Sequence, residues 1–134
     1  MLSLIYVSTA TDAFQRGELA ALADLSAAEN ARRGVTGMLA YNGEHFMQLL
    51  EGEDTEVEQT LARIAEDPRH QSLVVIRRDQ RRARECPDWS MQSFLTPLKG
   101  AGSATMFAAR LPATFASDTR VVFTSFASIL REVA

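Results

Sequence analysis

Residues 35–51 have the sequence VTGMLAYNGEHFMQLLE, in which two short apolar segments flank an Asn-Gly pair. Asn42-Gly43 favours the two-residue turn of a β-hairpin, because both central residues of that turn need a positive φ. Residues 35–41 and 45–51 are therefore predicted to be neighbouring antiparallel strands. The other elements can be placed outward from this hairpin.

The segments on either side of the hairpin alternate between strand and helix patterns. Residues 2–8 are short, apolar and β-branched or aromatic, as in a buried strand, and residues 72–79 predict another. Residues 15–31 are rich in Ala, Leu and Glu and have one apolar face at helical spacing. A second helix is predicted from about 54 to 67, where Pro68 ends it. The resulting order, βαββαβ, is the ferredoxin-like arrangement.

Two further segments complete the predicted α+β architecture. Residues 89–95, after Pro87, predict a fifth strand, and residues 119–133 carry apolar side chains at helical spacing. We expect a mixed sheet with two helices on one face and the C-terminal helices on the other. The chain is expected to be one domain, in which residues 1–97 form the main body and residues 98–134 a helical cap.

Composition excludes several classes of protein. The chain has 134 residues, a length typical of one domain, with 14 basic and 17 acidic residues and a net charge of −3. This charge weighs against general nucleic-acid binding. One cysteine, Cys86, allows no intramolecular disulfide and, with no signal-peptide pattern, favours a cytoplasmic location. No zinc motif is present, so no metal is expected, and no apolar run approaches the ~18 residues of a membrane span.

Three polar side chains are predicted to face one interior space. The first and third strands of a ferredoxin-like sheet are central neighbours, and side-chain alternation puts Tyr6 and Gln48 beneath the two helices. Asn30 lies on the apolar face of the first helix, which meets the same sheet. A buried phenol or amide without a partner costs ~1–3 kcal/mol, so these groups either bond to one another and to backbone or bind a ligand. Their convergence favours a ligand, and a heterocycle with carbonyls and a ring N–H matches them.

Five segments of the chain, in this order and spacing, resemble the BLUF family of blue-light sensors that use flavin. They are Leu4–Ser8, Asn30–Leu39, Phe46–Gly52, Arg63–His70 and Asp88–Met91. The resemblance covers roughly residues 2–95. It implies that residues 1–97 are a flavin-binding domain, with FAD expected and FMN or riboflavin as alternatives.

The resemblance also implies roles for individual residues. Tyr6 matches the family's photoactive tyrosine, Gln48 its switching glutamine and Asn30 its flavin-ring asparagine. The other implied positions are Arg63, Ile64, Asp67 and His70 near the cofactor, and Trp89 and Met91 in signal transmission. Arg63 and Asp67, four residues apart, are expected to share a helix face. One departure is Glu29, where family members often have a second asparagine.

A photoreceptor without an effector domain, rather than an enzyme, is the function that this resemblance implies. Light would move an electron and then a proton from Tyr6 toward the flavin through Gln48, leaving Gln48 rotated or tautomerised. Gln48 would then alter its contact with the fifth strand through Trp89 or Met91, which as alternate residues of a strand should share a face. The change would reach the C-terminal helices, with output in trans through an unknown downstream protein or a homo-oligomer interface.

Two other classes of function remain open from the sequence. Acyl-phosphate hydrolases of ferredoxin-like fold use an Arg and an Asn near phosphate, which Arg63 and Asn30 could supply, but residues 8–13 lack the Gly-rich loop. Another small-ligand-binding module is also consistent. Residues 77–84 contain five arginines that could contact nucleic-acid phosphates. The net charge favours instead a solvated surface or a partner-docking patch.

Overall fold

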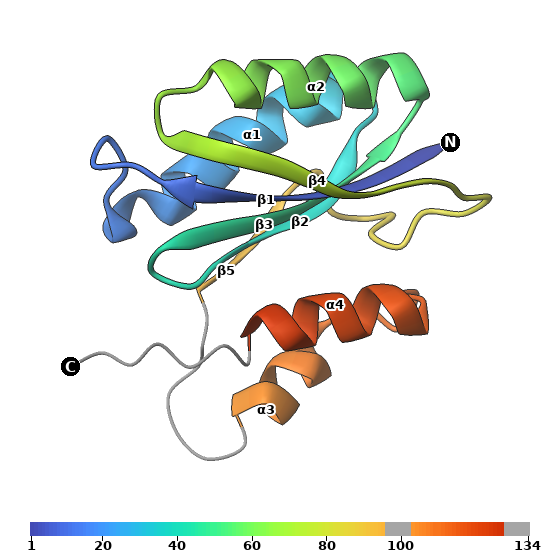
Figure 1. Cartoon of the computed structure of the whole chain (residues 1–134). Coiled ribbons are helices and arrows are strands. Elements are labelled where there is room, and N and C mark those ends of the chain that lie inside the picture. Colours follow the sequence, from blue (N-terminus) through green and yellow to red (C-terminus); the bar gives the residue numbers. More distant parts are fainter. Residues whose placement is uncertain (96–102, 128–134) are drawn as a thin grey trace.

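The computed structural model describes residues 1–95 and 103–127, and its elements follow the predicted order (Figure 1). The strands are β1 (Leu2–Ala10), β2 (Thr36–Tyr41), β3 (His45–Gly52), β4 (His70–Gln80) and β5 (Gln92–Leu95). The helices are α1 (Leu19–Arg33), α2 (Asp54–Glu66), α3 (Ser103–Arg110) and α4 (Ser117–Ala127), with a short 3₁₀ turn, η1 (Arg16–Glu18), before α1.

The five strands form one mixed sheet in the order β4-β1-β3-β2-β5. β1 and β3 are antiparallel neighbours at its centre, and the β2–β3 hairpin is antiparallel as predicted. β5 pairs in parallel with β2, which makes the sheet mixed. The predicted ferredoxin-like fold with an added fifth strand is therefore confirmed.

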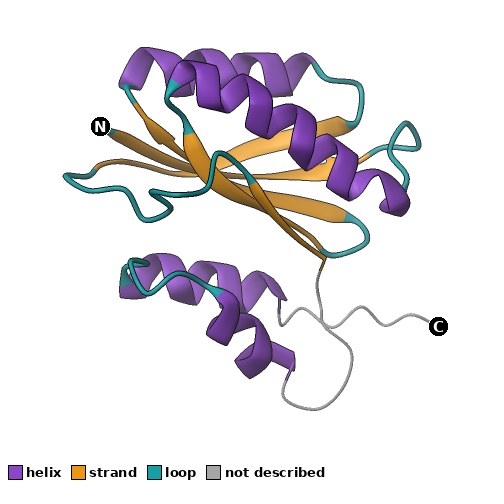
Figure 2. Cartoon of the chain, turned by 180° about the vertical axis from the view of Figure 1, so that it is seen from behind, coloured by secondary structure: helices purple, strands orange, loops and turns teal. Residues whose placement is uncertain are grey.

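Helices cover both faces of the sheet. Figures 1 and 2 show α1 and α2 on one face and α3 and α4 on the other. Alternation along β1 supplies both layers, because Leu4 and Tyr6 enter the core under α1 and α2 while Ile5 enters the core over α3 and α4. The sheet is thus buried on both sides.

Several predicted boundaries differ from the structure by one or two residues, and three elements need a fuller comparison. The first helix begins at Leu19 rather than near residue 15, because η1 precedes it. β5 begins at Gln92 rather than at Trp89, since residues 87–91 form a loop in which the Trp89 N–H donates to the Cys86 carbonyl at 3.2 Å. The predicted helix 119–133 corresponds to α4, which is described as far as Ala127; the rest of it lies outside the described residues.

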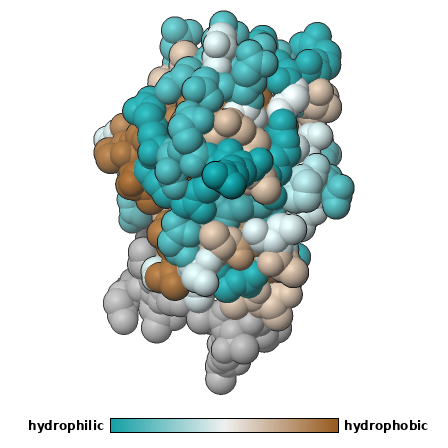
Figure 3. Space-filling model, turned by 90° about the vertical axis from the view of Figure 1, so that its right-hand side faces the viewer, coloured by the Kyte–Doolittle hydropathy of each residue, from teal (hydrophilic) through white to brown (hydrophobic). Residues whose placement is uncertain are grey.

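Hydrophilic residues dominate the side of the molecule in Figure 3, and hydrophobic residues gather along one margin. Among the side chains that the structure describes, the large apolar ones that are exposed are Leu25, Val74, Ile76 and Val121. Over the described ranges, no helix has the length and apolar character needed to cross a bilayer.

Candidate functional site

A cavity of about 190 Å³ lies where α1 and α2 cover β1 and β3. Every residue that the resemblance assigns to cofactor binding lines it. These are Tyr6, Asn30, Gln48, Arg63, Ile64, Asp67 and His70, and the remaining lining residues are Leu22, Leu25, Ser26, Glu29, Leu39, Thr60 and Arg69. The wall is therefore mixed, with apolar side chains between polar groups that can bind a heterocycle.

Tyr6 and Gln48 meet at the centre of the sheet. The β1–β3 register places them directly opposite each other, and both side chains are buried. The Tyr6 hydroxyl donates a hydrogen bond to Gln48 Oε1. Burial, and to a lesser extent the negative charge of Asp67, raises the pKa of Tyr6 above its ordinary value. The phenol thus stays protonated at neutral pH and acts as a donor.

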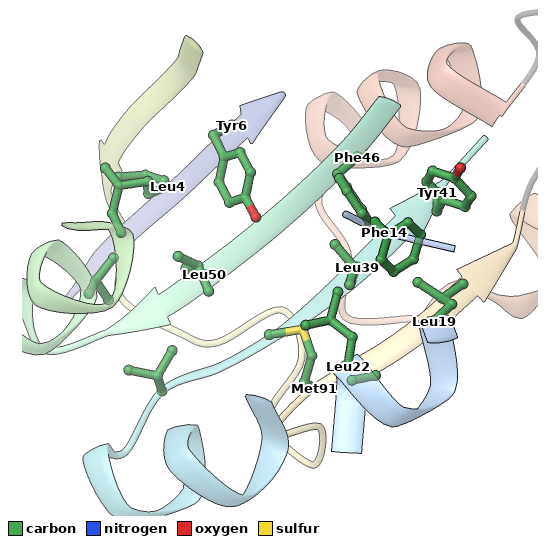
Figure 4. Close-up of a cluster of buried hydrophobic side chains, with 14 of the residues drawn as sticks. Leu4, Tyr6, Phe14, Leu19, Leu22, Leu39, Tyr41, Phe46, Leu50 and Met91 are labelled. Carbon is green, nitrogen blue, oxygen red and sulfur yellow. The ribbon is translucent and has the colours of Figure 1, made fainter. Parts of the chain in front are cut away.

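Gln48 continues this chain of hydrogen bonds to Met91. Its Nε2 donates to Met91 Sδ at 3.2 Å, and Met91 lies in the same core as Tyr6 (Figure 4). Trp89 packs in the opposite core, with its ring 5.9 Å from that of Phe94. The expectation that Trp89 and Met91 share a face is therefore wrong, because these residues belong to a loop without the alternation of a strand.

Asn30 ties α1 to the loop that carries Met91. Its Nδ2 donates to the Ser90 carbonyl at 3.0 Å, and its side chain is buried against the cavity. α1 ends just beyond it at Gly34, whose φ of 69° is in the left-handed region. This termination lets the Val35 N–H donate to the Asn30 carbonyl at 2.9 Å and directs the chain into β2.

The charged end of the cavity lies past the last turn of α2. Asp67 accepts hydrogen bonds from the Arg69 side chain at 2.9 Å, and this bonding holds the pKa of Asp67 below its ordinary value. Arg63 donates to Thr60 at 3.3 Å rather than pairing with Asp67. Asp67 lies directly after α2 with an extended backbone rather than inside the helix, and both residues line the cavity.

His70 is neutral at the edge of the cavity. Its Nδ1 lies 2.7 Å from the Ser8 hydroxyl, and its ring packs at 4.5 Å from that of Phe46. Burial lowers the pKa of His70 to about 4, with Asp67 opposing this shift and Arg69 adding to it. The imidazole therefore acts through hydrogen bonding and packing rather than through charge at neutral pH.

A second hollow of about 580 Å³ adjoins the cavity on the side of α2's C-terminus. Its lining residues are Ala13, Arg63, Glu66, Asp67, Pro68 and Arg69. The two spaces share Arg63, Asp67 and Arg69, so the cavity leads toward two arginines. Arg69 has no assigned role in the sequence-based prediction, although its place beside Asp67 and His70 is a local signal for it.

Glu29, the departure from the family pattern, also lines the cavity. Its carboxylate accepts hydrogen bonds from Arg32 and, at 3.0 Å, from Arg33. These bonds lower the pKa of Glu29, so it is an anion at neutral pH. Glu29 therefore forms ion pairs with Arg32 and Arg33 of its own helix, α1.

The arginines of residues 77–84 bind mainly to groups of this chain. Arg77 and Arg81 pair with Asp118 of α4 at 3.3 and 2.7 Å, and Arg84 donates to the Gly34 carbonyl at 2.7 Å. The arginines therefore join the sheet to its flanking segments.

Within the described ranges, no group of three His, Cys, Asp or Glu residues could hold a metal ion.

A family model described as sensors of blue-light using FAD (BLUF) matches residues 1–92. The chain belongs to the BLUF family. This agrees with the fold and with the polar residues that converge on the cavity.

Relatives of known function support this assignment. The chain is 34% identical over 92 residues to the blue light- and temperature-regulated antirepressor BluF of Escherichia coli, and the match covers 69% of this chain and 23% of that protein. It is 32% identical over 91 residues to the photoactivated adenylate cyclase subunit beta of Euglena gracilis, covering 66% and 11% respectively. The match thus spans less than a quarter of either relative.

Solved structures match this fold over 70 to 96% of the chain. The dark-state structure of BlrB, a BLUF protein, is 35% identical with a TM-score of 0.67, covering 70% of this chain and 71% of that one. The BLUF structure of BlrP1 is 26% identical with a TM-score of 0.81, covering 95% and 89%. Klebsiella pneumoniae BlrP1 with FMN and cyclic diGMP is 28% identical with a TM-score of 0.80, covering 96% and 35%.

Proposed function

We propose that this chain senses blue light with a flavin bound non-covalently between α1 and α2. The observation that carries the proposal is the chain of hydrogen bonds from Tyr6 through Gln48 to Met91 in the cavity wall. A phenol, an amide and a thioether are linked in series there. The amide is the middle member, accepting through Oε1 and donating through Nε2, so its orientation decides which partners are bonded.

The side chains present suit a flavin. The Asn30 and Gln48 amides can each donate to a ring carbonyl and accept from a ring N–H, while Leu22 and Leu39 offer apolar contact to a flat ring. The adjoining hollow with Arg63 and Arg69 suits the phosphate of a flavin nucleotide. FAD is therefore the proposed cofactor, and FMN and riboflavin are the alternatives to be compared.

The bound flavin supplies absorption of blue light and, when excited, a strong electron acceptor. Tyr6 would be the electron donor to the excited flavin, and its proton would pass to Gln48 Oε1 along the existing hydrogen bond while Gln48 Nε2 gives up a proton toward the flavin. The electron and a proton would then return to Tyr6, so no residue would be oxidised at the end of the cycle. Gln48 is left rotated or in its other tautomer, and its Nε2 no longer donates to Met91 in the original way.

The output passes from Met91 toward β5 and the C-terminal helices, and from there to a partner protein or a second copy of this chain. The cyclase and antirepressor activities named for the relatives belong to those proteins. The single, buried Cys86 suits a reducing, cytoplasmic setting and has no part in the cycle.

Gln48→Leu tests the proposal directly. Leucine removes both the acceptor for Tyr6 and the donor to Met91 at similar volume. The variant should still purify with flavin but should lose the red shift of absorption under blue light. A Gln48→Leu protein with an unaltered light-induced shift would exclude Gln48 as the switching group.

A further inference from the structure

Residues 84–91 form a segment that reaches from the cavity to the C-terminal helices. At the cavity end, the Ser90 carbonyl accepts from Asn30 and the Met91 sulfur accepts from Gln48. The other end of the segment is held by buried polar groups. This is the described loop through which the cavity is hydrogen-bonded to the layer of α3 and α4.

Glu51 anchors the segment to the sheet. It follows Gln48 by three residues on β3, so its side chain leaves the opposite face of the sheet, where it is fully buried. Its carboxylate accepts from the backbone N–H groups of Glu85 and Cys86, at 2.8 and 2.5 Å, and from the Thr36 hydroxyl at 3.1 Å. β3 thus presents Gln48 to the cavity on one face and, through Glu51, is hydrogen-bonded to residues 85 and 86 of the segment on the other face.

Glu85 in turn holds the start of α4. Its Oε2 accepts from the Ala116 N–H at 2.7 Å, and its Oε1 accepts from the hydroxyl of the buried Thr119 at 3.0 Å. Its backbone carbonyl accepts from the Thr114 hydroxyl. One buried carboxylate therefore joins the segment to both the loop before α4 and the first turn of α4.

We infer that Glu51 and Glu85 are positioning residues that couple the Gln48 switch to α4 through residues 84–91. The inference rests on the proposed function. When Gln48 turns away from Met91, the segment loses one of its two side-chain bonds at the cavity, while Glu51 and Glu85 keep its other end attached to β3 and α4. A displacement of the segment is then transmitted to the first turn of α4.

Ion pairs also fix α4 on the sheet, and the carboxylate of Asp118 provides a control. Their arginines also reach the coupling residues: Arg77 and Arg81 lie 3.4 and 3.8 Å from Glu85 Oε1, and Arg77 donates to the Thr119 hydroxyl at 2.7 Å. Asp118 pairs with Arg77 and Arg81 but contacts neither Glu51 nor residues 84–91 by a hydrogen bond. Asp118→Asn weakens the attachment of α4 to β4 and leaves the bonds of Glu85 to Ala116 and Thr119 in place. It separates loss of coupling from general loosening of the helix.

The test is hydrogen–deuterium exchange of the full chain with bound flavin, in the dark and under blue light. In the wild type, the exchange rate of amides in residues 117–127 should differ between the two conditions. In Glu85→Gln and Thr119→Val, these exchange rates should be about equal in light and dark, a ratio of about one, while the flavin red shift persists. Thr119→Ser keeps the hydroxyl and should retain the wild-type ratio, as should Asp118→Asn despite faster exchange overall.

The outcomes distinguish this inference from the proposed function. If Thr119→Val or Glu85→Gln keeps the full ratio, or if the wild type shows a red shift with no exchange difference in α4, the coupling is wrong and the sensor assignment stands. If the wild type binds flavin but shows no red shift, the proposed function fails and the coupling with it. Should Glu85→Gln not fold, the Thr119→Val and Thr119→Ser pair decides the question alone.

Discussion

Gln48 links a strong hydrogen bond to a weak one. The Tyr6 hydroxyl is a good donor to its amide oxygen, whereas the thioether of Met91 is a poor acceptor for its amide nitrogen. The bond to Met91 is therefore the one that Gln48 can exchange at least cost for a carbonyl acceptor on a ligand. This asymmetry makes Gln48 suited to be a switch and Tyr6 suited to be its fixed partner.

Tyr6→Phe should retain flavin and lose the light-induced red shift. Phenylalanine keeps the buried ring but removes the hydroxyl that donates to Gln48. The absorption spectrum of the purified variant, recorded before and after blue light, measures the effect. Tyr41→Phe, which alters a buried tyrosine of the same core away from the cavity lining, is the matched control and should keep the shift.

The neutral state of His70 makes folding stability depend on pH. Its pKa of about 4 in the folded chain lies below the unfolded value of 6.5, so the unfolded chain binds more protons between these values. The free energy of unfolding should thus fall as pH drops from about 6.5 toward 4, by at most about 3 kcal/mol from this group.

Chemical denaturation at pH 7 and pH 5 measures this dependence. In His70→Gln, which keeps a polar group near Ser8 but cannot be protonated, the loss between the two pH values should be smaller than in the wild type. An equal loss in both proteins would show that other groups account for the acid sensitivity.

The β2–β3 pair depends on a glycine at residue 37. A Cβ built on Gly37 would lie 1.8 Å from the carbonyl oxygen of Leu49, a contact that only separation of the strands can relieve. Gly37→Ala should therefore lower the free energy of unfolding by about 2–3 kcal/mol in urea denaturation. Gly17, whose added Cβ would meet nothing within 4 Å, is the control, and Gly17→Ala should change stability by less than about 1 kcal/mol. Equal effects of the two substitutions would contradict this account of the strand pair.

Elements with strong local patterns could be predicted from the sequence, and segments held by tertiary contacts could not. The Asn42-Gly43 pair predicted the β2–β3 hairpin, and the ferredoxin-like strand order with alternation along β1 and β3 correctly placed Tyr6 beside Gln48. The loop before β5 has no repeating pattern, so the opposite directions of Trp89 and Met91 were not predictable. The pairing of Asp67 with Arg69 rather than Arg63 likewise depends on where α2 ends.

The buried position of Glu85 was even less accessible to sequence reasoning. Glu85 directly follows the arginine-rich segment 77–84, whose charged sequence resembles a solvated surface. Its burial follows only from contacts with Ala116 and Thr119, some thirty residues later in the chain. Charged residues in such a segment can be assigned only when the fold is known.

The two hydrophobic cores, one on each face of the sheet, contain different parts of the proposed mechanism. One core, under α1 and α2, contains the cavity, and the other, over α3 and α4, contains Trp89 and the aromatic side chains of the C-terminal helices. A flavin bound between α1 and α2 would join two helices and should stabilise the fold as a whole. At a ligand concentration 100 times Kd, the expected gain is about 2.7 kcal/mol.

The identity of the flavin can be tested through Arg63. If this arginine at the mouth of the cavity binds phosphate, FMN and FAD should bind several-fold more tightly than riboflavin. Arg63→Gln should reduce that preference, as measured by titration of the apoprotein with each flavin. Arg78→Gln, which removes a surface arginine paired with Glu58, should leave the preference unchanged. An unchanged preference in Arg63→Gln would exclude Arg63 as a phosphate ligand.

Whether the chain is a flavin-based light sensor is decided by the absorption spectrum of the purified protein, recorded in the dark, under blue light and during return to darkness. We expect a yellow protein whose flavin bands shift to longer wavelength under blue light and recover in the dark, without covalent attachment to Cys86. A protein that takes up no flavin, or that binds flavin with identical dark and illuminated spectra, would contradict it.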